Sequence, residues 1–252
     1  MRELNRKHRA APGKTLAAAA LLAFGALGLG LAAPAEAGVV VKSSGPSSAT
    51  YPVGKKLDDS AQITLQSGDS VTILTSRGSR IIRGPGSHRV GARGASKRSA
   101  FAILTRQRAN SRVRTGAVRG GPSSEASLAN PNIWNVDVTQ GGRICLANDA
   151  SVNLWRPDSS GAQNYRVTRL DNERSAMITF ADGASQASLS TDVLPVEQGA
   201  AYSITSGDET RTLEFVILED VPRTPEDMAS VLAENGCNAQ LDLLASRLMV
   251  ST

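Results

Sequence analysis

Two cysteines and two histidines are the residues with the most versatile chemistry in this chain of 252 residues. Cys145 and Cys237 stand far apart, outside any Cys-x-x-Cys motif, and His8 falls in the basic N-terminal stretch. The remaining histidine, His88, lies in "GPGSHRV", a turn that enters a strand, and the sequence contains no Gly-x-Ser-x-Gly nucleophile motif. Zinc needs three or four protein ligands, which these residues do not supply. We therefore expect a protein that is not an enzyme and has no cofactor or metal site.

A pair of carboxylates for glycoside cleavage stays open, because such a pair has no sequence spacing of its own. The aromatic residues that usually line sugar subsites are few, namely Trp134, Trp155 and three tyrosines. Both tryptophans lie in strand-like runs, where packing in a core is the default role.

The cysteine pair itself predicts a disulfide bond. An even number of cysteines in an exported protein is typical of pairing. A Cys145–Cys237 bridge would close a long loop, for which chain-entropy estimates give roughly 4–5 kcal/mol of stabilisation. It would tie the C-terminal segment to the middle of the chain.

Arginine is the other residue type whose distribution indicates chemistry. Twelve Lys and Arg, and no Asp or Glu, lie between positions 77 and 119. The planar guanidinium of Arg can bind a carboxylate, phosphate or sulfate through two parallel hydrogen bonds. The residues predicted to bind an anion or a partner are Arg77, Arg80, Arg83, Arg89, Arg93, Arg98, Arg106, Arg108, Arg112 and Arg114. Lys97 and Arg119 complete the run.

Three interpretations of this Arg-rich segment stay open. It can bind an anionic envelope polymer or lipid, or a membrane protein. It can dock, within the chain or in an oligomer, against residues 120–252, which contain eight basic and 18 acidic residues. It can also be a solvated loop with no ligand. Nucleic acid is not expected, because Phe101 is the only aromatic residue interleaved with the basic ones.

The first residues are typical of a signal peptide. A basic start precedes an apolar run over residues 16–31, and Ala35-Glu36-Ala37 offers small residues at the cleavage position. The run is shorter than the roughly 20 residues that span a bilayer. We expect general secretion, cleavage after Ala37, and a periplasmic or secreted protein.

Residues 38–98 are predicted to form a small β-element. "QITLQ" and "VTILT" flank a turn at Gly68-Asp69, and "RIIRG" follows a second turn at Arg77-Gly78. Short β-branched runs separated by glycine turns predict a meander of hairpins. Through these turns and the strand spacing, residues 57–90 resemble the periplasmic β-domain of FecR-type sensor-regulators. The resemblance implies an envelope-sensing or regulatory module that recognises a membrane protein.

Residues 99–131 are predicted to be an Arg-rich helix, over 99–110, followed by a linker. From Ile133 the β pattern resumes, with runs such as "IWNVDV", "RICLA", "NYRVTRL" and "TLEFVILE". Repeated short strands predict an antiparallel sandwich within residues 132–252. Thr224-Pro225 then begins a helix, Asn235-Gly236 ends it, and Asn238 starts another. The predicted fold is mainly β: a small N-terminal β-meander plus an antiparallel β-sandwich with a C-terminal helical hairpin.

Overall fold

The computed structural model describes residues 36–91, 97–106, 129–148 and 151–249. The signal peptide predicted over residues 1–37 lies outside this part, apart from its last two positions. Within the described residues, no helix is both long and apolar enough to cross a membrane.

The N-terminal β-element consists of two small antiparallel sheets. The first contains β1 (Glu36–Ser44), β2 (Lys56–Asp58), β4 (Ser70–Thr75) and β5 (Gly78–Arg83), in the order β2-β1-β4-β5. The second pairs β3 (Gln62–Leu65) with β6 (Gly86–Arg89), and a short 3-10 helix, η1 (Pro46–Ala49), follows β1. Alternation along the strands directs apolar side chains between the sheets. This core contains Val40, Leu57, Ile63, Leu65, Val71, Ile73, Ile82 and Val90.

The Gly68-Asp69 turn is held by the buried side chain of Asp69. Its Oδ1 accepts the backbone N–H of Ser47 at 2.9 Å, and its Oδ2 accepts that of Gln66 at 2.5 Å. Burial raises the pKa of this carboxyl, but these hydrogen bonds outweigh it, and the net pKa is lowered. Gly45 has φ +97°, and a Cβ there would lie 2.6 Å from Asp69 Oδ1. Asp69 therefore joins the β3–β4 turn to the start of η1.

The C-terminal strands form two facing sheets, which confirms the predicted β-rich fold. The larger sheet contains β8 (Gly142–Leu146), β10 (Gln163–Arg169), β11 (Ser175–Phe180), β13 (Ala201–Ser206) and β14 (Glu209–Ile217), in the order β11-β10-β13-β14-β8. The smaller contains β7 (Val136–Asp137), β9 (Val152–Trp155) and β12 (Gln186–Leu189), in the order β12-β9-β7. Their shared core includes Ile144, Leu154, Val167, Phe180, Tyr202 and Phe215.

Two of these pairings are parallel, β8 with β14 and β7 with β9, whereas the strand pattern alone favoured antiparallel neighbours throughout. A parallel pair needs a long connection rather than a tight hairpin. The chain provides one between β8 and β14, because β9 to β13 intervene between them.

Three helices complete the described fold: α1 (Arg98–Leu104), α2 (Pro225–Glu234) and α3 (Asn238–Arg247). The start of α2 is as predicted, since the Thr224 hydroxyl accepts the N–H of Asp227 at 3.2 Å and Pro225 occupies the first turn. The end of α1 differs from the prediction, because it stops at Leu104. Positions 107–110 of the predicted helix lie outside the described residues.

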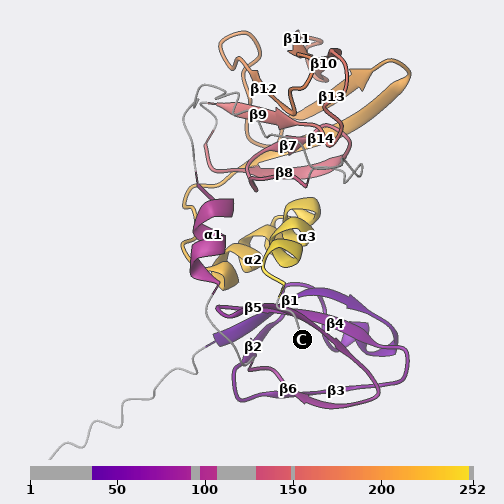
Figure 1. Cartoon of the computed structure of the whole chain (residues 1–252), viewed down its shortest axis with the longest axis vertical. Helices are drawn as coiled ribbons and strands as arrows, with labels where there is room; N and C mark the ends of the chain where they lie inside the picture. The colour runs from indigo at the N-terminus through magenta and orange to yellow at the C-terminus, as the bar shows by residue number, and fades with distance from the viewer. Residues whose placement is uncertain (1–35, 92–96, 107–128, 149–150, 250–252) are drawn as a thin grey trace, which may run out of the picture. The chain divides into compact units, whose positions relative to one another are not determined.

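The helices share one core with strands from both ends of the sequence, and Figure 1 shows them between the two groups of strands. Val39 and Leu74 of the first sheet, and Cys145 and Val216 of β8 and β14, belong to this core. Side chains of successive strand residues point to opposite faces of a sheet. On β8 and β14, Ile144 and Phe215 therefore point into the core of the sandwich, whereas Cys145 and Val216, the next residues, point toward the helices. The helical hairpin therefore packs on the N-terminal sheet as well as on the sandwich.

Candidate binding surface

The predicted binding residues do not share one environment, and Arg80 differs most from the rest. It points from β5 to the side of Ile82, toward the core between the two N-terminal sheets. Its guanidinium donates to the backbone carbonyls of Arg89 and Val90, the latter at 2.8 Å. Burial lowers the pKa of Arg80, although arginine keeps its charge. Arg80 thus ties β5 to the end of β6 inside the chain.

Arg83 and Arg89 are exposed at the ends of β5 and β6. Arg83 is opposite Ser70 of β4, and Arg89 is opposite Gln62 of β3. Because Ile82 is buried, its neighbour Arg83 must face the opposite side of the sheet, toward solvent.

A second group of basic residues lies where the β4–β5 turn meets α1. Arg77 and Arg98 are exposed there, and the N–H of Lys97 donates to the Ser76 carbonyl at 3.2 Å. The Thr75 hydroxyl fixes the turn, since it accepts from the N–H of Arg77 at 3.3 Å and donates to the Gly78 carbonyl at 3.1 Å. These cations are therefore displayed on ordered backbone.

One carboxyl group approaches this turn from α2. Burial raises the pKa of Glu226, the charge of Asp227 adds to the rise, and hydrogen bonds, including those with Ser76, oppose it. Glu226 is half-buried, so a carboxyl group of α2 lies beside the β4–β5 turn.

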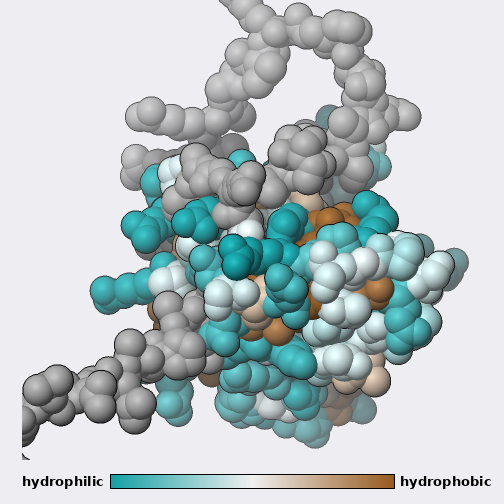
Figure 2. All heavy atoms as spheres, turned by 90° about the horizontal axis from the view of Figure 1, so that it is seen from below, coloured by the Kyte–Doolittle hydropathy of each residue, from teal (hydrophilic) through white to brown (hydrophobic). Residues whose placement is uncertain are grey.

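Arg106 is exposed just beyond α1, and its carbonyl accepts from Asn132 Nδ2 at 2.8 Å. We define the basic surface as the exposed Arg77, Arg83, Arg89, Arg98 and Arg106 together with the half-buried Lys97. The remaining predicted residues, Arg93, Arg108, Arg112 and Arg114, lie outside the described residues, as does Arg119. Viewed from the end that carries β3 and β6, the surface is largely hydrophilic, with small, separate apolar areas (Figure 2).

His88 is partly covered and faces the same side of its sheet as the buried Ile63. Its Nε2 has no hydrogen-bond partner in the described part of the chain. Across the same residues, no three His, Cys, Asp or Glu side chains gather to hold a metal ion.

Both tryptophans pack against the protein, but only Trp155 lies in a strand, because Trp134 lies in a turn before β7. Trp155 is buried, and the half-buried Trp134 donates its indole N–H to the Thr105 carbonyl at 2.8 Å.

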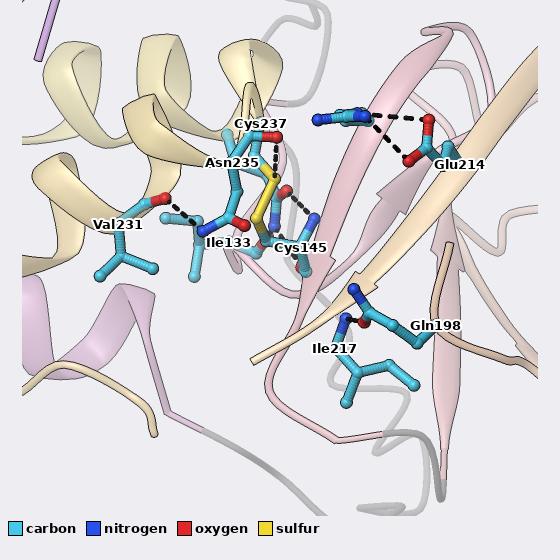
Figure 3. The surroundings of a disulfide bond; sticks show 10 residues. Ile133, Cys145, Gln198, Glu214, Ile217, Val231, Asn235 and Cys237 are labelled. Carbon is cyan, nitrogen blue, oxygen red and sulfur yellow. Dashed lines mark hydrogen bonds and ion pairs between the residues drawn. A yellow bond between two sulfur atoms is a disulfide. The ribbon is translucent and has the colours of Figure 1, made fainter. Parts of the chain in front are cut away.

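The Cys145–Cys237 disulfide is confirmed, with a Cα–Cα distance of 5.9 Å (Figure 3). Beside it lies Gln240 of α3, a buried residue whose role the sequence did not reveal. Its Nε2 donates to the carbonyls of Cys145 and Ile133 at 2.7 and 2.8 Å, and its Oε1 accepts the N–H of Cys145 at 2.7 Å. Gln240 therefore hydrogen-bonds to the backbone N–H and C=O of Cys145 on the edge of β8 that faces away from β14. The one feature of the sequence that could have indicated this role is that Gln240 is a polar residue on the apolar side of a predicted helix.

The chain matches no protein-family model, and no curated protein or solved structure is significantly similar to it.

Proposed function

We propose that the protein is an exported, non-catalytic binding protein, which holds an anionic partner at the cell envelope through its basic surface. The observation that carries the proposal is the display of Arg77, Arg83, Arg89 and Arg98 on ordered strands, turns and a helix. The sequence from residue 77 to residue 106 itself contains no Asp or Glu.

Export is supported by the sequence of the first 37 residues and is compatible with the disulfide, because such bonds persist in oxidising compartments. Arginine is suited to the proposed partners, since its fork of donors matches carboxylate, phosphate and sulfate groups.

The expected affinity is modest and sensitive to salt. An exposed ion pair contributes roughly 0.2–1 kcal/mol. The six side chains of the basic surface then give at most about 6 kcal/mol together, which corresponds to a Kd of tens of micromolar. A Debye length of about 8 Å at physiological ionic strength screens exposed pairs, so added salt should weaken binding steeply.

The test compares two charge-reversed double variants. Arg83→Glu with Arg89→Glu alters the basic surface, while Arg166→Glu with Arg174→Glu changes the same net charge at exposed positions of the β10–β11 hairpin. Binding to heparin and to vesicles containing phosphatidylglycerol is measured from low to high salt. The first variant should lose at least about tenfold in affinity and the second less than about twofold. Equal losses in both variants, or no binding by the unaltered protein, would contradict the proposal.

A second candidate function is envelope sensing or regulation through a membrane protein, as the FecR-type resemblance of residues 57–90 implies. The position of β5 as the last strand of its sheet favours it, because a sheet edge can bind an extended polypeptide. Capture of one membrane protein from intact cells, insensitive to salt, would support this function.

A further inference from the structure

β5 is the last strand of its sheet, and beyond Ser79 none of the residues that the structure describes pairs with its outer edge. The N–H of Ser79 donates to the Leu248 carbonyl at 2.8 Å, which is away from β4, whereas the N–H of Gly84 donates to the Asp69 carbonyl on the β4 side. Backbone groups in a strand alternate in direction, so the N–H and C=O of Ile81 and Arg83 also point away from β4.

Leu248 and Met249, which follow α3, already lie beside the start of this edge. Ser79 and Met249 form a parallel bridge, which is the only bridge on that side of β5 among the described residues. The Ser79 hydroxyl also donates to the Ala245 carbonyl of α3. Ser79 thus already makes backbone contacts on this edge, which continues past that point with Ile81 and Arg83.

We infer that the edge of β5 docks an extended acidic segment of a partner polypeptide, which adds as a further strand beside Ile81 and Arg83. The inference rests on the proposed function and names the class of its partner. Main-chain hydrogen bonds would hold the segment, and side chains of the two strands would select it.

The side chains on this edge define the sequence that fits. Ile81 is 39% exposed, and by alternation it shares a face with the exposed Arg83. Cross-strand neighbours lie close enough to interact. The docked segment therefore places an apolar residue beside Ile81 and, two positions away, a carboxylate beside Arg83.

The charge around the edge favours an acidic partner. Arg83 ends β5 and Arg89 ends β6, and no carboxylate lies in the sequence between them. Such complementarity selects partners and accelerates their encounter. A charged edge residue can also serve only to prevent self-association, and the experiment below separates the two roles.

The edge of β8 shows how a side chain of this protein can cover the backbone groups of an edge strand. There the Gln240 side chain occupies both backbone groups of Cys145. In the described part of the chain, no side chain is recorded in that position at Ile81 or Arg83.

The experiment uses the full processed chain with its disulfide intact, and a synthetic nine-residue peptide, Thr-Val-Thr-Glu-Thr-Val-Thr-Glu-Thr, in which Val and Glu stand two positions apart on one face of the strand. A second peptide has the same sequence but carries N-methyl groups on alternate residues, which removes the donors that a docked strand needs. Fluorescence anisotropy measures both. The unmethylated peptide should bind at least about tenfold more tightly. Equal binding of the two peptides would overturn the inference.

Variants of the protein, rather than of the peptide, test the same edge of β5. Ile81→Pro removes a donor that points away from β4, and Ile81→Thr is the matched control that keeps it. We expect the proline variant to weaken peptide binding at least tenfold and the threonine variant less than threefold. Equal effects of the two would contradict the inference, and if Ile81→Pro does not fold, the methylated peptide decides alone.

Two further results assign the occupant and separate the two proposals. If removal of residues 250–252 raises the peptide affinity, the inference is supported, because the end of the chain then competes for this edge. Dimerisation that Ile81→Pro abolishes would overturn it in favour of a second copy. Arg83-dependent binding to heparin or vesicles without strand-like peptide binding would leave the proposed function standing and refute the inference alone.

Discussion

Arg156, the residue after β9, provides the sharpest test of how the C-terminal sandwich is held together. It is 2% exposed, and its guanidinium lies 5.1 Å from the centre of the Phe180 ring. Its nitrogens donate to the carbonyls of Ala184, Ser159, Gly161 and Ala181 at 2.8–3.1 Å, and to Gln163 Oε1 at 3.4 Å. The buried guanidinium of Arg156 thereby links the loop after β9 to the loop after β11.

The variant Arg156→Met keeps much of the apolar stem and removes every donor. Each buried carbonyl left without a partner costs about 1–3 kcal/mol, so the four together set an upper limit of roughly 12 kcal/mol. The neighbouring residues Ser160, Gly161 and Ala181 are exposed, so the loops can open and let water reach their carbonyls. We therefore expect a loss of about 3–5 kcal/mol in the free energy of unfolding, comparable with removal of one partner of a buried ion pair.

Urea unfolding followed by tryptophan fluorescence measures this loss, because Trp155 is adjacent to the substituted residue. Arg166→Met is the matched control, since Arg166 is exposed on β10 and its replacement should change stability by less than about 0.5 kcal/mol. Arg156→Lys should fall between them, because lysine keeps the charge but cannot reach the same fork of acceptors. A loss below about 1 kcal/mol for Arg156→Met would refute this account of the buried cation.

Three further predictions concern the other buried contacts. Gln240→Leu should lower the free energy of unfolding by about 2–4 kcal/mol, because it leaves backbone groups of Cys145 unsatisfied, whereas the exposed Gln186→Leu should have little effect in the same melt. Replacement of Cys145 and Cys237 by serine should cost roughly 4–5 kcal/mol, and a reductant should then no longer shift the melting temperature. The pKa of Asp69 is lowered in the folded protein, so its contribution is present above about pH 4 and is lost as the pH falls through the folded value. Asp69→Asn should flatten the acid side of the stability curve below that pH, and an unchanged acid side would show that the carboxylate has no such role.

The elements themselves were predictable because their signals are local. Alternating β-branched runs, glycine turns and the Thr224-Pro225 helix start each act within a few residues, and the structure has strands or helices at these places. The cysteine pair was predictable because the chain has only two. The parallel pairing of β8 with β14 was not, since no local pattern specifies which distant strands become neighbours.

The candidate surface was predictable as a region but not residue by residue. The sequence analysis predicted the same role for Arg80 and Arg83. Residues three positions apart on a strand lie on opposite faces, so Arg80 points toward the core and Arg83 toward solvent. Arg156 and Gln240 are buried against carbonyls that come from several segments of the chain. No spacing of residues in the sequence predicts these contacts.

The disulfide has a mechanical consequence for the proposed docking of a partner along β5. Tension applied to that strand passes through the Ser79 contacts into the end of α3, whose first turn follows Cys237 directly. From there a covalent bond carries the load to Cys145 in the larger C-terminal sheet. The link between the helices and that sheet would therefore resist pulling even where the non-covalent packing around it yields.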